Sequence, residues 1–283
     1  MDTVLFPNAK LNYGLTVGSR RPDGFHRLHT IFLPLYGYYD ELRIHELPGP
    51  PAIALHAHQS YNLGPQADNL VAKAYRLLLS FEPPRVEATL VKHIPIGAGL
   101  GGGSADAAFM LQHMALRCSK RVPHDLLPEL ALTLGSDVPF FLINRPCQAS
   151  GRGELCQPIQ LDLPFQWVLV ATPNQRISTA QAFATLDHLR ILPPEDTTQE
   201  LVQDAQYPLN PKNDFWPAVL RLCPSILQLY QALKALSPAQ LSLSGSGSTL
   251  YALFRGPRPT HDLEIPNATT RLLPLGQAPS TQE

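Results

Sequence analysis

The residues of this chain best suited to chemistry form a glycine-rich stretch, PIGAGLGGGSADAA, at residues 95–108. Its five glycines fall within seven positions, after a segment (86–91) that alternates as a strand does and before a run of helix-forming residues. Glycine permits positive φ angles and lets a ligand approach the backbone closely. A helix beginning at such a loop offers free N–H groups and the positive end of its dipole to an anion. The pattern predicts a phosphate site, with a flexible turn as the alternative.

Two well-known phosphate motifs share part of this spacing, and the context excludes both. Gly97, Gly99 and Gly102 spell G-x-G-x-x-G, but a dinucleotide fold needs a second strand after the helix, ending in an acidic residue. Here another helix is expected instead, near residue 124. Gly97 and Gly102 also fit a Walker loop, yet Gly103 stands where its lysine must be. We therefore expect a phosphate loop of another architecture.

Two isolated charged residues could add catalytic chemistry. Lys10 shares a strand face with Asn12, and a lone lysine on a strand is usually a solvated surface charge. Asp137 follows an expected helix and precedes an apolar segment, residues 139–143, that we interpret as a strand. Its side chain either organises a turn or takes a proton from an attacking hydroxyl group.

A second small-residue loop, SGSGS, occupies residues 244–248 between two expected strands. Its exposed N–H groups could close over a phosphate or a substrate. A plain hairpin is the alternative.

Composition narrows the class of protein. The chain has 283 residues, a net charge of −1 and a pI near 6.8, which argues against a surface for nucleic acid. Its four cysteines form no C-x-x-C pair, and His56 with His58 lacks a third nearby ligand, so we expect no metal site built by the protein. The first residues do not resemble a signal peptide, and no apolar run is long enough to span a membrane. We expect a cytoplasmic protein with no membrane or nucleic-acid partner.

The elements that must position these residues mix strands and helices without regular alternation, which favours an α+β fold. Expected strands lie at residues 4–6, 11–17, 28–35, 41–46, 52–57, 86–91, 139–143, 167–171, 241–243 and 250–254. Expected helices include one to residue 78, N-capped by Asp68, and others at 103–118, 124–134, 178–188, 197–205, 213–222 and 225–236. The pattern loosens around residues 149–158, so we place a domain boundary there, giving domains 1–155 and 156–283.

In their order along the chain, these motifs resemble those of the GHMP small-molecule kinases. The segments that carry the resemblance are residues 7–12, the Asp23-Gly24-Phe25-His26 turn, Asp68-Asn69-Leu70, and residues 95–108, 135–140 and 244–248. The first motif, the turn and Asn213-Asp214 narrow it to members acting on a cytidine diphosphate-linked methylerythritol. The resemblance extends to about Arg255 and implies an N-terminal domain like ribosomal protein S5 domain 2 and a ferredoxin-like C-terminal domain.

The resemblance also implies an activity, transfer of a phosphoryl group from ATP, with Mg²⁺, to an alcohol on this small molecule. Asp137 would be the catalytic base and Lys10 the cation beside it. Expected ATP-binding residues are Asp68, Asn69, Leu70, Pro95, Gly97, Ala98, Gly99, Leu100, Gly101, Gly102, Gly103 and Ser104. Expected substrate-binding residues are Asn12, Phe25, His26, Phe183, Gly245, Ser246 and Gly247, with Phe25 and Phe183 sandwiching the cytosine and His26 reading its polar edge. The expected assembly is a monomer or a weak homodimer.

Three positions depart from the family pattern. Phe25 stands where tyrosine is usual, Ala105 replaces a common serine, and Ser248 replaces proline or alanine. The tail from Gly256 fits the family's last helix poorly. Two other functions stay open: another GHMP kinase, of the homoserine or mevalonate type, and a non-catalytic nucleotide or RNA binder on the same fold.

Overall fold

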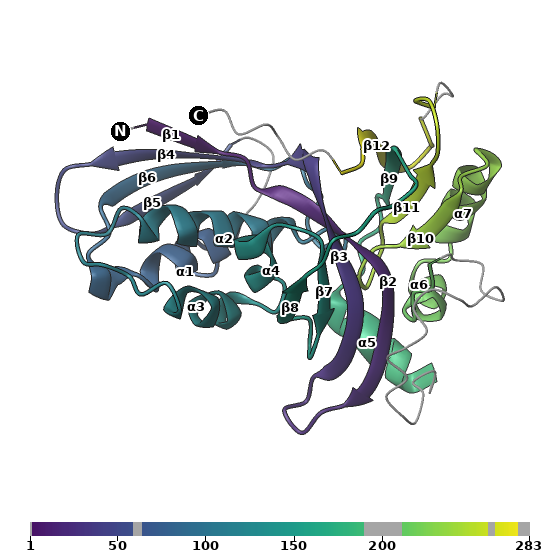
Figure 1. Ribbon diagram of the computed structural model, residues 1–283, viewed down its shortest axis with the longest axis horizontal. Coiled ribbons are helices and arrows are strands. Elements are labelled where there is room, and N and C mark those ends of the chain that lie inside the picture. Colours follow the sequence, from purple (N-terminus) through teal and green to yellow (C-terminus); the bar gives the residue numbers. More distant parts are fainter. Residues whose placement is uncertain (1, 59–63, 190–210, 260–263, 277–283) are drawn as a thin grey trace. The chain divides into compact units, whose positions relative to one another are not determined.

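The computed structural model describes residues 2–58, 64–189, 211–259 and 264–276, and its chain divides into two compact units (Figure 1). The first unit contains residues 1–9, 38–96 and 101–144, and the second contains 10–37, 97–100 and 145–283. The glycine-rich stretch passes from the second unit to the first at Gly101. The division into domains 1–155 and 156–283 stays a prediction.

The first unit is a four-stranded sheet with helices on one face (Figure 1). Its strand order is β1 (Asp2–Leu5), β4 (Glu41–Leu47), β6 (Arg85–Val91) and β5 (Ile53–Ala57). The helices are α1 (Leu70–Arg76), α2 (Gly102–Ala115), α3 (Leu126–Leu134) and α4 (Val138–Ile143), with a short 3-10 turn at Leu79–Phe81. Along β6, Val86, Ala88 and Leu90 are buried in alternation, as the period-two pattern predicted.

Two local predictions in this unit are wrong. Asn69, not Asp68, caps α1, because its Oδ1 accepts the N–H of Val71 at 2.9 Å. Both residue types are good caps, so their adjacency left the choice open. Residues 139–143, expected as a strand, belong to helix α4. A short apolar run does not reveal its period, and Pro139 in the first turn is compatible with a helix.

The second unit contains an antiparallel sheet in the order β10 (Gln240–Leu243), β11 (Leu250–Phe254), β9 (Trp167–Pro173) and β12 (Ala268–Pro274). Counted along the chain, this order is 2-3-1-4, the arrangement of a ferredoxin-like sheet. Strand β12 lies in the proline-rich tail, where the sequence predicted no element. Between β11 and β12, the described residues 255–259 and 264–267 contain no helix.

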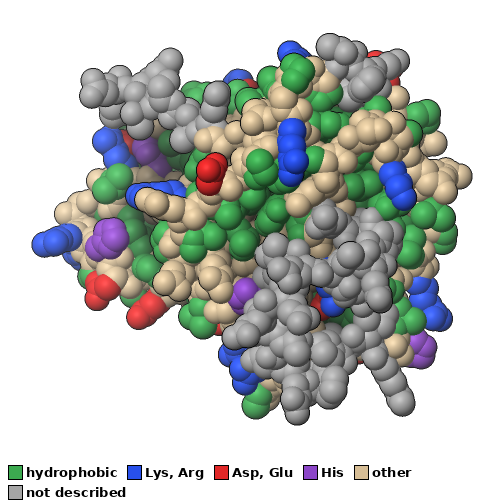
Figure 2. All heavy atoms as spheres, turned by 45° about the vertical axis from the view of Figure 1, so that its right-hand side comes forward, with side chains coloured by type: hydrophobic (Ala, Val, Ile, Leu, Met, Phe, Trp, Pro, Cys, Tyr) green, Lys and Arg blue, Asp and Glu red, His purple; other side chains and the backbone are tan. Residues whose placement is uncertain are grey.

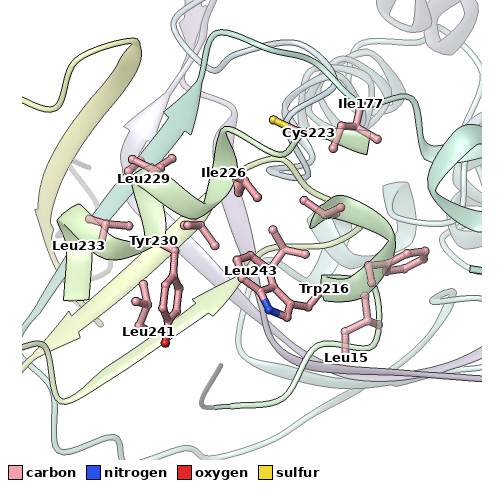
Figure 3. Close-up of a cluster of buried hydrophobic side chains, with 14 of the residues drawn as sticks. Leu15, Ile177, Trp216, Cys223, Ile226, Leu229, Tyr230, Leu233, Leu241 and Leu243 are labelled. Carbon is pink, nitrogen blue, oxygen red and sulfur yellow. The ribbon is translucent and has the colours of Figure 1, made fainter. Parts of the chain in front are cut away.

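Helices α5 (Thr179–Leu189), α6 (Trp216–Leu222) and α7 (Ile226–Ala235) complete this part of the second unit. Apolar side chains of α6 and α7 meet those of the sheet, and Trp216 packs against Tyr230 with ring centroids 5.5 Å apart (Figure 3). Burying such side chains stabilises the fold by about 1.5–3 kcal/mol each. The helix expected at residues 197–205 lies outside the described residues.

A third sheet pairs β2 (Asn8–Arg20), β3 (His26–Tyr39), β7 (Cys147–Ser150) and β8 (Leu155–Pro158). Strands β7 and β8 occupy the segment where the sequence pattern loosened, and neither was predicted. Ala149 lies opposite Thr30 in the β3–β7 register. With sheets and helices in both units, the predicted α+β class is confirmed.

Charges of both signs are interspersed on the face shown in Figure 2, with apolar and uncharged side chains between them. Ion pairs such as Arg117–Glu46 and Lys120–Glu82 join neighbouring groups. None of the helices in the described ranges is long and apolar enough to cross a membrane.

Candidate active site

The backbone of the glycine loop alternates between positive and negative φ angles. Gly97, Gly99 and Gly101 have φ angles of 71°, 79° and 72°, while Ala98 and Leu100 between them remain at negative φ. Alternating conformations of this kind turn successive N–H groups toward one concave side, where an anion can bind. The glycines are therefore required by the conformation of the loop.

Helix α2 begins directly at the end of this loop. Gly101 is its N-cap, and the N–H of Ala105 makes the first helical bond to the Gly101 carbonyl at 2.9 Å. The N–H groups of Gly102, Gly103 and Ser104 precede it and have no acceptor within the helix. Leu70, at the start of α1, has its Cδ1 within 3.9 Å of an ideal Cβ at Gly103. This places one predicted nucleotide-binding residue beside the first turn of α2.

In the second unit, residues 97–100 pack against the second small-residue loop. Ser244 Oγ donates a hydrogen bond to the Gly99 carbonyl at 2.9 Å, and Thr249 N donates to the Ala98 carbonyl at 3.4 Å. A Cβ at Gly99 would lie 2.2 Å from the Ser244 carbonyl oxygen. Residues 244–248 do link two antiparallel strands, but they also pack against residues 97–100 of the glycine loop.

Asn213 holds the second loop in place. Its Nδ2 donates to the carbonyls of Leu243 at 2.8 Å and Gly245 at 3.0 Å, and its Oδ1 accepts the N–H of Phe215 at 2.9 Å. The side chain is buried, so these bonds satisfy groups that water does not reach. The sequence marked Asn213 only through the family resemblance, and the structure gives it this role in the loop.

Lys10 is buried, with only 3% of its surface exposed, so the solvated-charge alternative is wrong. Its Nζ donates to Asn12 Oδ1 at 2.5 Å and lies 4.8 Å from the centre of the Phe32 ring. Asn12 Nδ2 in turn donates to Thr30 Oγ1 at 3.1 Å. The backbone N–H of Lys10 donates to the Leu100 carbonyl at 2.9 Å. A buried cation is thus anchored to the glycine loop itself.

Asp137 lies in the first unit, at the N-cap of α4 rather than before a strand. It is half-buried and has a helical backbone conformation, with φ −83° and ψ −14°. Its carboxylate does not cap the described helix α4. Both roles of Asp137, organising a turn and accepting a proton, stay predictions.

His26 and Phe183, expected at the cytosine, lie together in the second unit. Their rings stack with centroids 5.1 Å apart and planes 12° apart. The His26 Nδ1 is 3.2 Å from the Gly18 carbonyl, and its Nε2 is 3.2 Å from a carboxylate oxygen of Asp187. Because a carbonyl only accepts, Nδ1 carries a proton. Asp187 was not predicted, although its place four residues after Phe183 on α5 sets both on one helix face.

Phe25 is 48% exposed, and the Arg152 guanidinium lies 4.6 Å from the centre of its ring. The sandwich of cytosine between Phe25 and Phe183 stays a prediction. Ser246, in the second loop, donates from Oγ to Thr179 Oγ1 at the start of α5, at 3.1 Å. The loop and the helix that carries Phe183 are therefore in contact.

Comparison with known proteins identifies the class of this fold and site. The model for the GHMP kinases N terminal domain matches residues 69–145, and that for the GHMP kinases C terminal matches residues 200–265. Together with the glycine loop at the start of α2, these matches define an ATP-dependent small-molecule kinase of the GHMP type.

Relatives that match over most of their length identify the family within this class. A 4-diphosphocytidyl-2-C-methyl-D-erythritol kinase of Solidesulfovibrio magneticus is 39% identical, covering 90% of this chain and 89% of the relative. One of Bacteroides thetaiotaomicron is 38% identical, covering 89% and 92%. A crystal structure of 4-(cytidine 5'-diphospho)-2C-methyl-D-erythritol kinase is 31% identical and superimposes with a TM-score of 0.76, covering 98% of this chain and all of that one. The chain belongs to the 4-diphosphocytidyl-2-C-methyl-D-erythritol kinase family.

Proposed function

We propose that this kinase transfers the γ-phosphoryl group of ATP to the 2-hydroxyl of 4-diphosphocytidyl-2-C-methyl-D-erythritol. The products are the 2-phosphate and ADP, formed in the non-mevalonate pathway to isoprenoid precursors. The observation that carries the proposal is the buried Lys10, whose backbone is hydrogen-bonded to Leu100 of the glycine loop. A fixed cation beside a phosphate loop suits a reaction in which negative charge moves between phosphate oxygens.

The acceptor in this reaction is a tertiary alcohol, which is a crowded and weak nucleophile. Phosphoryl transfer depends mainly on positioning and on stabilising charge, with a base to receive the hydroxyl proton. We assign that base to Asp137. Lys10 stabilises the negative charge that develops on the attacking oxygen. The hydrogen bond from Lys10 to Asn12 fixes where its ammonium group points.

The glycine loop suits the triphosphate of ATP. Apart from Gly97 itself and its two chain neighbours, no heavy atom of the described residues lies within 4 Å of an ideal Cβ at Gly97, which leaves space beside the loop for a phosphate group. Asp68, Asn69 and Leu70, at the start of α1, are assigned to the adenosine.

Mg²⁺ enters with ATP in this proposal. The described residues contain no group of three or more His, Cys, Asp or Glu side chains placed to hold a metal. We therefore propose that the ion is held largely by phosphates and water, with few protein oxygens, as is usual for Mg²⁺. When bound, the ion neutralises charge on the transferring phosphoryl group.

The acceptor's cytosine is assigned to the ring cluster of the second unit. Stacking on Phe25 and Phe183 supplies apolar contact. His26 supplies polar contact to the edge of the base when the base takes the place of Asp187 at its Nε2. Asn12, Gly245, Ser246 and Gly247 are assigned to the rest of the acceptor.

We propose that the enzyme acts in the cytoplasm as a monomer or a weak homodimer.

The choice of acceptor tests this function. With ATP and Mg²⁺ in a coupled ADP-release assay, we expect the cytidyl alcohol to exceed homoserine and mevalonate in kcat/KM by about 10⁴-fold, because these acceptors leave polar groups meant for the base unpaired. Equal turnover of homoserine or mevalonate would favour the other GHMP kinases instead. ATP binding without transfer to any acceptor would favour the non-catalytic binder.

A further inference from the structure

Three charged side chains form a buried cluster in the first unit that the proposed chemistry does not use. Lys92 Nζ forms ion pairs with Asp40 Oδ2 and, at 2.7 Å, with Asp106 Oδ2. The side chains of Lys92, Asp40 and Asp106 are 4%, 0% and 3% exposed. Removing charges from water is unfavourable and is offset only by close pairing and hydrogen bonding. Hydrophobic side chains of similar volume could fill such a site with equal or greater stability, which points to a positional role for these charges.

Asp40 fixes the segment that leads into the glycine loop. Its Oδ1 accepts the backbone N–H of His93 at 2.6 Å and of Ile94 at 2.8 Å. These residues follow Lys92 at the end of β6 and come directly before Pro95. The same carboxylate therefore binds the Lys92 side chain and the two backbone groups after it.

Asp106 connects Lys92 to helix α2, which begins at the other end of the glycine loop. It lies on α2, just over one turn after the N-cap Gly101. At the start of that helix, a Cβ on Gly102 would be 2.9 Å from Ile94 Cγ2 and 3.2 Å from Lys92 Nζ. The first residue of α2 thus packs directly on the cluster.

The electrostatics of Asp106 indicate a group held there by its partners. Burial raises the pKa of Asp106, and Lys92 opposes that rise. The charged side chains that interact with Asp106 are Lys92 and Asp40. Its Oδ1 has no hydrogen-bond partner among the residues that the structure describes. Lys92 and Asp40 thus link Asp106 to the segment before the loop.

We propose that Asp40, Lys92 and Asp106 form a clamp that joins both ends of the glycine loop and sets the position of the first turn of α2. They are positioning residues and do not touch ATP. The inference rests on the proposed function in taking this loop as the site of the ATP phosphates. Its consequence is that cutting the clamp weakens ATP binding more than it slows phosphoryl transfer.

The test variant is Asp106→Ala, which removes the link from α2 to Lys92 while leaving the Lys92–Asp40 pair intact. We expect its KM for ATP to rise by about 10- to 100-fold, because small displacements of positioning groups cost up to that much. We expect kcat and the KM for the acceptor to change little. Asp106→Asn keeps the shape and an oxygen for Lys92, and should restore ATP affinity close to that of the unaltered chain.

A matched control is Met114→Ala, which removes a fully buried side chain from the same helix about two turns farther on. It should lower the free energy of unfolding without changing the KM for ATP. Titration of each variant with ATP, followed by protein fluorescence, measures ATP affinity in the absence of an acceptor. The test of the clamp therefore holds even if the cytidyl alcohol is not the acceptor. An ATP affinity of Asp106→Ala equal to that of Met114→Ala would overturn the proposal, as would an equal rise in both KM values. If Asp106→Ala does not fold, Asp106→Ser, which is too short to reach Lys92, carries the same expectation.

Discussion

Replacing Asp137 by asparagine is expected to lower kcat by about 10²–10⁴-fold, the usual contribution of a positioned base. The amide has the shape of the carboxylate but cannot take the proton of the acceptor hydroxyl. The ATP affinity should stay almost unchanged, because the phosphates are assigned to the backbone of the glycine loop. Single-turnover transfer and ATP titration measure the two quantities separately.

Asp125→Asn is the matched control for this change. Asp125 is the N-cap of α3, with a helical backbone like that of Asp137, and its side chain likewise does not cap the described helix. Its substitution should leave kcat unaltered. Retained turnover in Asp137→Asn would contradict the assignment of the base, and an equal loss in both variants would point to a general effect on the fold.

Replacing Gly99 by alanine is expected to have the second largest effect. Positive φ at this position strains any L-residue by about 1–2 kcal/mol. The added Cβ would also lie 2.2 Å from the Ser244 carbonyl oxygen, a backbone atom that cannot rotate away. Overpacking of this kind costs about 1–3 kcal/mol more. Both loops must shift, so the KM for ATP should rise together with the loss of stability.

Gly97→Ala separates the effect of backbone strain from that of the contact with Ser244. Gly97 has nearly the same φ, 71° against 79°, but apart from its chain neighbours a Cβ there meets no heavy atom of the described residues within 4 Å. It should show only the backbone strain in its free energy of unfolding, measured by denaturant titration. Equal losses in the two variants would show that the contact with Ser244 carries no energy.

Much of the fold could be predicted because it depends on local pattern. The alternation at residues 86–91 and the glycines at residues 97–103 define strand, loop and helix without help from the rest of the chain. Residues 139–143 could not be assigned this way, since a run of five apolar residues does not distinguish a buried strand from a short helix. Strand β12 was missed for a related reason: its place depends on pairing with β9, almost a hundred residues earlier.

The candidate site shows the same division. Its residue types and order predicted a phosphate loop, and the family resemblance then named Lys10 and Asp137. The burial of Lys10 could not be predicted, because it depends on Asn12 and the Phe32 ring across the sheet. The Asp40–Lys92–Asp106 cluster joins residues up to 66 positions apart, and single charged residues in a sequence do not reveal such partners.

The position of the transferred phosphate is the direct test of transfer to the 2-hydroxyl. The full chain would be incubated with ATP, Mg²⁺ and 4-diphosphocytidyl-2-C-methyl-D-erythritol, and the product examined by ³¹P and ¹³C NMR. We predict one new phosphomonoester, coupled to the tertiary carbon C2, in an amount equal to the ADP formed. A phosphate on any other hydroxyl, or ADP formed with release of inorganic phosphate alone, would rule out this transfer.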